Sequence, residues 1–212
     1  MVLEKRLDDI LDTRSKVKII RLFVSRREDY MSSGRAIAKL IGVTPPAVHT
    51  ALKDLLNHDI LKREIIGGQH IYRINPSSRI VKEILRPAFQ KEVSVKDDIG
   101  KFLLNKIKEH NIVRSIISLL IYGSMAKGEA HHYSDCDIAI VVKDASSKKK
   151  VETVFIDTIS REFSDYFATH LDSYIKTEDE FLKLLRGKRP PVSTLMKSYI
   201  VVYGKDPIRY TL

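Results

Sequence analysis

The sequence predicts an α+β protein in two parts, a helical domain with a hairpin followed by a domain that alternates helices and strands. Hydrophobic residues recur at helical spacing from residue 14 to residue 56, and two short apolar runs around a Gly-Gly turn follow them. From residue 98 onward, helical patterns alternate with apolar strand runs. The polar segment 91–97 lies between these patterns, so we expect domains at 1–90 and 98–212 joined by a linker.

The first domain begins with three expected helices. Apolar residues over 14–26 predict a mostly buried helix. The Ser-Ser-Gly sequence at 32–34 is typical of a helix start, and a short helix over 36–41 is expected to end at Gly42. The third helix starts at Thr44 as N-cap with Pro45 in its first turn, and its inner face carries Val48, Leu52, Leu55 and Leu56. Two helices joined by a tight turn form a helix-turn-helix.

A hairpin and a connecting helix complete the first domain. The apolar runs 60–66 and 70–74 flank Gly-Gly-Gln, which is a hairpin signal. Apolar residues over 80–85 then predict a helix, which Pro87 is expected to interrupt or kink.

The second domain is expected to be a mixed α/β sheet with helices. Its elements are a helix to about residue 110, a strand ending at Tyr122, a strand over 135–142, a helix over 148–164 and a strand over 167–175.

Charge is unevenly distributed over the chain, whose net charge is +10. Residues 1–95 hold 18 Lys and Arg against 11 Asp and Glu, whereas residues 96–212 hold 19 against 16. The basic excess of the first part favours a polyanionic partner for that part. A solvated, lysine-rich surface would have the same composition, so charge alone leaves both interpretations open.

Composition also limits the class of protein. No apolar stretch approaches the ~20 residues of a membrane helix, and the N-terminal residues lack the apolar core of a signal peptide. The single cysteine, Cys136, excludes an intramolecular disulfide and a cysteine-based zinc site. We therefore expect a cytoplasmic protein that has no membrane partner.

The most informative motif is Gly123-Ser124, followed after ten residues by Asp135-Cys136-Asp137 at the start of an apolar run. Side chains alternate along a strand, so Asp135 and Asp137 project from one face and Cys136 from the other. Two carboxylates this close repel each other, and a divalent cation between them relieves the repulsion. Ligands that are all oxygen favour Mg²⁺. The motif therefore indicates phosphoryl or nucleotidyl transfer.

The segments 123–128, 134–137 and 138–142 resemble the polymerase β-like nucleotidyltransferase superfamily, and most of all its minimal nucleotidyltransferases. The resemblance implies that Asp135 and Asp137 hold one or two Mg²⁺ ions against a nucleoside triphosphate, with ATP as the expected nucleotide. It also implies that Gly123 and Ser124 bind the phosphates, with Lys127 as a further phosphate contact.

The superfamily also uses a third carboxylate on the following strand, which completes a metal site and receives the acceptor's proton. Asp172 is the candidate in this chain, with Glu162 and Asp165 as substitutes. The expected catalytic and metal-binding residues are thus Asp135, Asp137 and Asp172. His131 and His132 are adjacent and point apart on an extended chain, which favours loop histidines over a zinc site.

Residues 10–76 resemble winged helix-turn-helix transcription regulators, whose second helix enters the DNA major groove. The resemblance implies a nucleic-acid partner, expected to be DNA. It assigns DNA contacts to the exposed side of that helix and to the hairpin, that is, to Pro46, His49, Thr50, Lys53, Lys62, Arg63 and Arg73. Winged helices also act as dimerisation or docking modules, so a homodimer and a protein-contact role stay open.

Together the two resemblances predict a Mg²⁺-dependent nucleotidyltransferase that moves a nucleoside monophosphate from an NTP to an acceptor hydroxyl. The acceptor classes left open are a partner protein such as a toxin, an RNA end and a small molecule such as an aminoglycoside. The alternative is a DNA-binding transcription regulator whose nucleotidyltransferase-like domain only senses a nucleotide.

Overall fold

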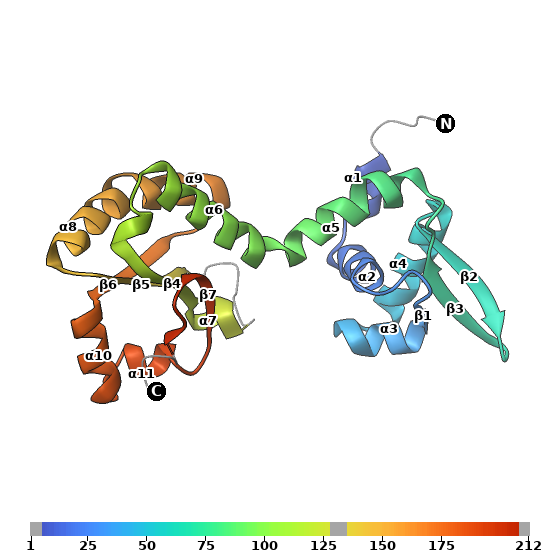
Figure 1. Cartoon of the computed structure of the whole chain (residues 1–212). Helices are drawn as coiled ribbons and strands as arrows, with labels where there is room; N and C mark the ends of the chain where they lie inside the picture. Colours follow the sequence, from blue (N-terminus) through green and yellow to red (C-terminus); the bar gives the residue numbers. More distant parts are fainter. Residues whose placement is uncertain (1–5, 128–134, 208–212) are drawn as a thin grey trace. The chain divides into compact units, whose positions relative to one another are not determined.

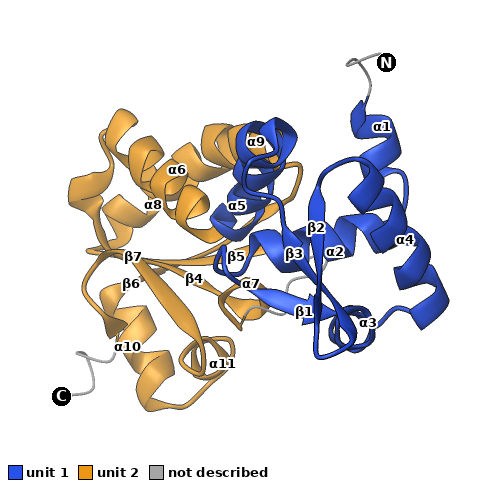
Figure 2. Ribbon diagram, turned by 90° about the vertical axis from the view of Figure 1, so that its right-hand side faces the viewer, with its two compact units in different colours: residues 1–95 blue, residues 96–212 orange. Residues whose placement is uncertain are grey.

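The computed structural model describes residues 6–127 and 135–207. The chain divides into two compact units, residues 1–95 and residues 96–212, which Figure 2 colours separately. No helix among the described residues is long and apolar enough to cross a membrane.

The first unit has the winged helix-turn-helix fold. Its three strands form an antiparallel sheet in the order β1-β3-β2 beside the helices, and β2 and β3 form the hairpin (Figure 1). Its elements are α1 (Arg6–Leu11), α2 (Arg14–Val24), β1 (Met31–Ser33), α3 (Gly34–Ile41), α4 (Pro45–Asn57), β2 (Leu61–Ile66), β3 (Gln69–Ile74), η1 (Val81–Leu85) and α5 (Arg86–Val93).

Local sequence signals explain where α3 and α4 begin and end. The Ser33 hydroxyl accepts a hydrogen bond from the Ala36 N–H and caps α3, as the Ser-Ser-Gly signal predicts. Gly42 ends α3 in the left-handed conformation, at φ 62°. Helix α4 begins with Pro45 in its first turn, while Thr44 occupies the cap position without a side-chain bond.

The segment around Pro87 remains helical. The π-type turn η1 runs directly into α5, and the Arg86 N–H donates to the Val81 carbonyl five residues earlier. A π-type turn is one of the local adjustments that irregular helices use, so the expected interruption is a local change of winding. Segment 91–97, expected as a linker, is also mainly helical: α5 ends at Val93 and α6 begins at Val95.

The second unit is a four-stranded sheet covered by helices on both faces (Figure 1). The strand order is β6-β5-β4-β7, in which β5 and β6 are parallel and the other pairs are antiparallel. Its elements are α6 (Val95–Glu109), η2 (Val113–Ser115), β4 (Ile116–Tyr122), α7 (Gly123–Lys127), β5 (Cys136–Val142), α8 (Ala145–Val154), η3 (Phe155–Ile159), α9 (Ser160–Phe167), β6 (Leu171–Thr177), α10 (Glu178–Arg186), α11 (Val192–Leu195) and β7 (Tyr199–Gly204).

The last predicted strand, at 167–175, is shifted in the structure to 171–177. Phe167 belongs to the end of α9, and Ala168 stops that helix in the left-handed conformation at φ 52°. The apolar pattern of the α9 end runs on into the strand, which is why the sequence alone places the boundary too early.

Alternation along β5 sorts its side chains between the two faces. Cys136, Ile138 and Ile140 pack toward α6, α8 and α9, whereas Ala139 packs toward α11. Asp137 therefore projects toward the α10 and α11 side. Cys136 is fully buried, and burial first, then the charge of Asp137, raises the pKa of its thiol to about 12.

Candidate active site and nucleic-acid interface

Two aspartates are paired across β5 and β6. The parallel register sets Asp137 opposite Asp172, and the Cys136 N–H donates to the His170 carbonyl at 2.8 Å at the start of the pairing. Paired residues of adjacent strands point to the same face, so both carboxylates lie on the α10 and α11 side. Leu171 is buried on the opposite face, and a slip of one residue would expose it and bury Asp172.

The surroundings of Asp137 disfavour its negative charge. Asp137 is half-buried, whereas Asp135 and Asp172 are exposed. Its pKa is raised above the ordinary value by burial first, then by the negative charges of Asp172 and of Asp135. Asp172 and Asp135 are therefore each close enough to Asp137 to repel its carboxylate.

A hard divalent cation such as Mg²⁺ suits this donor set, because the ligands are all carboxylate oxygens and because the cation would relieve the repulsion at Asp137. Within the described residues, no three His, Cys, Asp or Glu side chains already lie close enough together to hold a metal. The three carboxylates thus fit the metal in their chemistry, and their side chains would have to move closer together to bind it.

Gly123 connects the end of β4 to the short helix α7 and lies against Asp137. Its φ of 73° is in the left-handed region that favours glycine. A β-carbon at this position would overlap the Asp137 carboxylate. Ser124 follows in the first turn of α7 and is half-buried, and Lys127 is exposed at its end. A phosphate bound by Gly123 and Ser124 would lie directly beside Asp137.

Tyrosines border the carboxylates on the same face. Burial first, then the charges of Asp137 and Asp172, raises the pKa of Tyr122 to about 12, so its hydroxyl stays protonated at neutral pH and is available as a donor. Tyr174 and Tyr199 pack with it against a small apolar cluster around Leu120, Ala139 and Leu195. Periodicity and motif spacing do not identify Tyr122, although its position directly before Gly123 is a usable signal.

The proposed substitutes for Asp172 lie elsewhere. Glu162 and Asp165 are on α9, which covers the opposite face of the sheet, and Glu162 forms an ion pair with Lys106 at 2.9 Å. His131 and His132, considered for zinc, lie outside the described residues.

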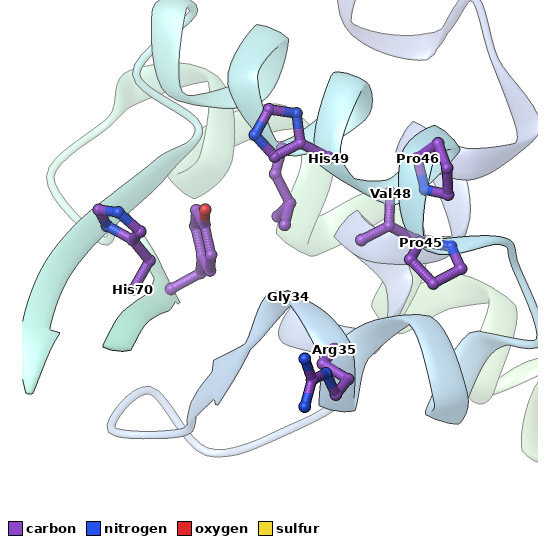
Figure 3. A pocket seen from close by; sticks show the side chains of 9 residues that line it. Gly34, Arg35, Pro45, Pro46, Val48, His49 and His70 are labelled. Carbon is purple, nitrogen blue, oxygen red and sulfur yellow. The ribbon is translucent and has the colours of Figure 1, made fainter. Parts of the chain in front are cut away.

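The first unit presents a cavity of about 410 Å³ between α3, α4 and the hairpin (Figure 3). In Figure 3, Pro46 and His49 of α4 lie on its border, with His70 of β3 and Arg35 of α3 at other points of the rim. Pro46, His49, Thr50 and Lys53 are all exposed on α4. This helix therefore borders a concave surface that has the Arg35 cation at its rim and the hairpin beside it.

Strand register separates the three basic residues of the hairpin. Arg63 pairs with Tyr72, which lines the cavity, so Arg63 belongs to the face that points toward α4. Lys62 and Arg73 pair with each other and belong to the opposite face. Arg73 is also engaged by Glu64, with Nε and Oε1 2.7 Å apart. Arg63 is thus the hairpin cation best placed beside α4.

Residues 104–207 match the family model described as "Polymerase beta, Nucleotidyltransferase". A search of curated proteins finds no match.

Among solved structures, the AntR antimony-specific transcriptional repressor is 20% identical, covers 43% of this chain and 78% of its own, and has a TM-score of 0.35. A toxin-antitoxin structure with AMP-PNP is 10% identical over 53% of this chain and 77% of its own, with a TM-score of 0.33. The adhesin competence repressor AdcR of Streptococcus pyogenes is 18% identical over 50% of this chain and 84% of its own, also with a TM-score of 0.33. These scores are too low to support a conclusion about function.

Proposed function

Because residues 104–207 match the family model "Polymerase beta, Nucleotidyltransferase", we propose that this chain transfers a nucleoside monophosphate from an NTP to an acceptor hydroxyl. The observation that carries the proposal is the register that sets Asp137 beside Asp172. Asp135 directly precedes β5, and the Gly123–Ser124 turn directly follows β4, the antiparallel neighbour of β5. The Gly123–Ser124 turn, which is the proposed phosphate contact, and three carboxylates thus lie at the same end of the sheet.

Gly123 and Ser124 are the proposed phosphate contacts. The Ser124 hydroxyl and the backbone N–H groups of the turn would donate hydrogen bonds to the phosphate. The missing side chain at Gly123 leaves room for the Asp137 carboxylate beside it. Asp135, Asp137 and Asp172 would hold Mg²⁺. When bound, Mg²⁺ would neutralise the phosphate charge and polarise the reacting phosphoryl group.

The reaction joins the acceptor oxygen to the α-phosphorus and breaks the bond from that phosphorus to the bridging oxygen of the β-phosphate, so pyrophosphate leaves. The acceptor hydroxyl must lose its proton in this step. A carboxylate oxygen of Asp172 is the proposed recipient, because Asp172 is exposed at the strand edge, whereas Asp137 is half-buried beside Gly123. Tyr122, which stays protonated, would instead donate a hydrogen bond.

The winged helix is proposed to bind DNA through the exposed residues of α4, with Arg63 contacting phosphate. The basic excess of residues 1–95 supports this assignment.

Label transfer from α-³²P-labelled NTPs tests the catalytic proposal, with Mg²⁺ and with cell extract as the source of acceptors. Asp137→Asn and Asp172→Asn should each lower transfer by about 100-fold or more. Asp165→Asn, on α9 of the opposite face, is the matched control and should leave transfer unchanged. Transfer that survives Asp137→Asn would overturn the assignment.

Nucleotide binding without transfer would support the alternative of a nucleotide-sensing regulator. In that case, NTP binding to the unsubstituted chain should change its DNA affinity, and Asp137→Asn should remove the change.

A further inference from the structure

A second cavity, of about 500 Å³, lies at the opposite end of the sheet from the carboxylates. It is bordered by the start of β4 and the ends of β5 and β7, whereas Asp137 lies at the start of β5. Its lining residues are Val113, Arg114, Ile116, Ile117, Lys143, Glu178, Tyr203, Gly204 and Lys205. Neither the family match nor the proposed transfer reaction gives this cavity a role.

Three basic residues line the cavity and come from three separate segments: Arg114 from η2, Lys143 after β5 and Lys205 after β7. Backbone bonds join these segments. The Lys143 N–H donates to the Ser115 carbonyl at 3.2 Å, and the Lys205 N–H donates to the Ile117 carbonyl at 3.0 Å. The cations are therefore carried on connected, hydrogen-bonded backbone.

The backbone of Lys205 is held by two hydrogen bonds to β4. The Ser118 hydroxyl donates to the Lys205 carbonyl at 2.6 Å, so this residue is bound through both its N–H and its carbonyl. Gly204 has a φ of 83° and presses against the Ile117 carbonyl, where a β-carbon would have no room. The fold thus fixes the backbone from which the Lys205 side chain projects.

An irregularity in β4 contributes the apolar wall. The pairing of β4 with β5 shifts register between Ile116 and Ser118, which leaves Ile117 outside the ladder. A bulge of this kind redirects side chains, and such bulges are frequent beside functional sites. Ile116, Ile117 and Tyr203 supply apolar and aromatic surface next to the three cations.

We infer that this cavity is a second ligand site, which binds a small organic phosphate of the nucleotide class. Arg114 and Lys143 outnumber the single lining carboxylate, that of Glu178, which favours an anion. The apolar and aromatic wall favours a ligand that carries a base or another flat group. The volume lies in the range of small-molecule sites, which argues against a polynucleotide. The inference is independent of the proposed transfer reaction, because no carboxylate of the active site lines the cavity.

Calorimetric titration of the full chain with ADP, in EDTA to exclude divalent metals, tests the inference. The Asp135→Asn/Asp137→Asn variant should bind ADP with unchanged affinity, which separates this site from the carboxylate site. The Arg114→Ser/Lys143→Ser variant should bind about tenfold more weakly or worse. Lys101→Ser/Lys149→Ser, which removes two exposed cations of the same unit, is the matched control and should bind normally.

Each other outcome overturns the inference. Absence of saturable ADP binding at millimolar concentration removes the site, and an equal loss in the control variant reduces it to general surface charge. Pyrophosphate that binds as tightly as ADP would show that the apolar wall contributes nothing. A single-stranded oligonucleotide that binds more tightly than ADP, and loses that binding in Arg114→Ser/Lys143→Ser, would make the cavity part of a polynucleotide surface.

Discussion

Gly123 and Asp137 lie so close together that the carboxylate of Asp137 occupies the space a β-carbon of Gly123 would need. The contact joins the end of β4 to the start of β5, so the expected phosphate contact and the expected metal ligand share one constraint. The φ of 73° at Gly123 adds a second constraint that only glycine meets without strain.

Gly123→Ala should therefore damage transfer far more than it damages folding. The left-handed conformation costs about 1–2 kcal/mol for alanine, and the displaced Asp137 carboxylate would lower transfer by about 100-fold. Gly100→Ala is the control, because a β-carbon there meets only Val202 at 3.9 Å and the position lies inside α6. Parallel assays of label transfer and thermal unfolding check this, and equal activity in both variants would contradict it.

Asp137→Asn should stabilise the second unit at neutral pH while it abolishes transfer. The pKa of Asp137 is raised in the folded state, so the folded chain holds this proton more tightly than the unfolded chain. Its contribution to stability is therefore most favourable below the unfolded pKa and declines as pH rises through the folded pKa. Asparagine has no carboxyl group to ionise, so the stability of this variant does not fall with pH through this group. We expect a higher melting temperature than that of the unsubstituted chain at pH 7, and no gain near pH 3.

Melting curves at both pH values measure this difference. Asp165→Asn, on α9, is the matched control and should show no comparable gain at pH 7. A lower melting temperature for Asp137→Asn at pH 7 would show that a favourable partner of the carboxylate outweighs the repulsion.

Mg²⁺ should raise the melting temperature of the unsubstituted chain in the presence of a non-hydrolysable NTP analogue, because the ion relieves the repulsion at Asp137. Asp137→Asn and Asp172→Asn should each reduce the Mg²⁺-dependent part of the shift. A shift that is the same in all three proteins would place the metal elsewhere. Differential scanning fluorimetry with and without EDTA gives the comparison.

The sequence predicts much of the candidate active site because the signals for it are local. The spacing of Gly123 and Asp137 follows from two adjacent strands, and the period of two along β6 is sufficient to put Asp172 on the right face once the strand is recognised. The helix caps at Ser33 and Gly42 are likewise local chemistry.

The elements that the sequence analysis missed depend on distant contacts. The edge strand β7 pairs with β4 across the chain, and its pattern of burial is irregular, so periodicity does not reveal it. The ion pair between Arg73 and Glu64 follows from hairpin register, which residue counting does not provide. The contact of Gly123 with Asp137 is also a tertiary feature: a Gly-Ser turn alone does not show which side chain fills the space.

Arg63→Ala should weaken DNA binding more than Lys62→Ala, although both residues are exposed neighbours on β2. Register puts Arg63 on the face that points toward α4 and Lys62 on the other face. Loss of one phosphate contact should reduce the slope of log K against log salt by about 1. Titration of a DNA fragment from upstream of the gene at several salt concentrations measures both quantities. Equal slopes for the two variants would mean that the hairpin does not approach DNA in this orientation.

Lys16→Met should destabilise the first unit through a buried charge cluster. Lys16 Nζ donates to the Asp9 carbonyl at 2.7 Å and forms ion pairs with Asp12 at 3.0 Å and Asp54 at 3.2 Å, and its side chain is only 6% exposed. Burial alone would lower the pKa of Lys16, but its bonds to Asp12 and Asp54 outweigh burial and raise it. The cluster therefore ties α4 to the start of α2.

Methionine keeps the length of the Lys16 side chain but leaves the Asp9 carbonyl and two carboxylates without their donor. We expect a loss of about 1–3 kcal/mol, since both aspartates keep access to water. Lys18→Met is the control, because Lys18 is exposed and makes one bond, to the Ile41 carbonyl. Urea unfolding followed by circular dichroism compares the two. DNA binding should fall with Lys16→Met only under conditions that partly unfold the first unit, because Lys16 is buried and acts through the position of α4.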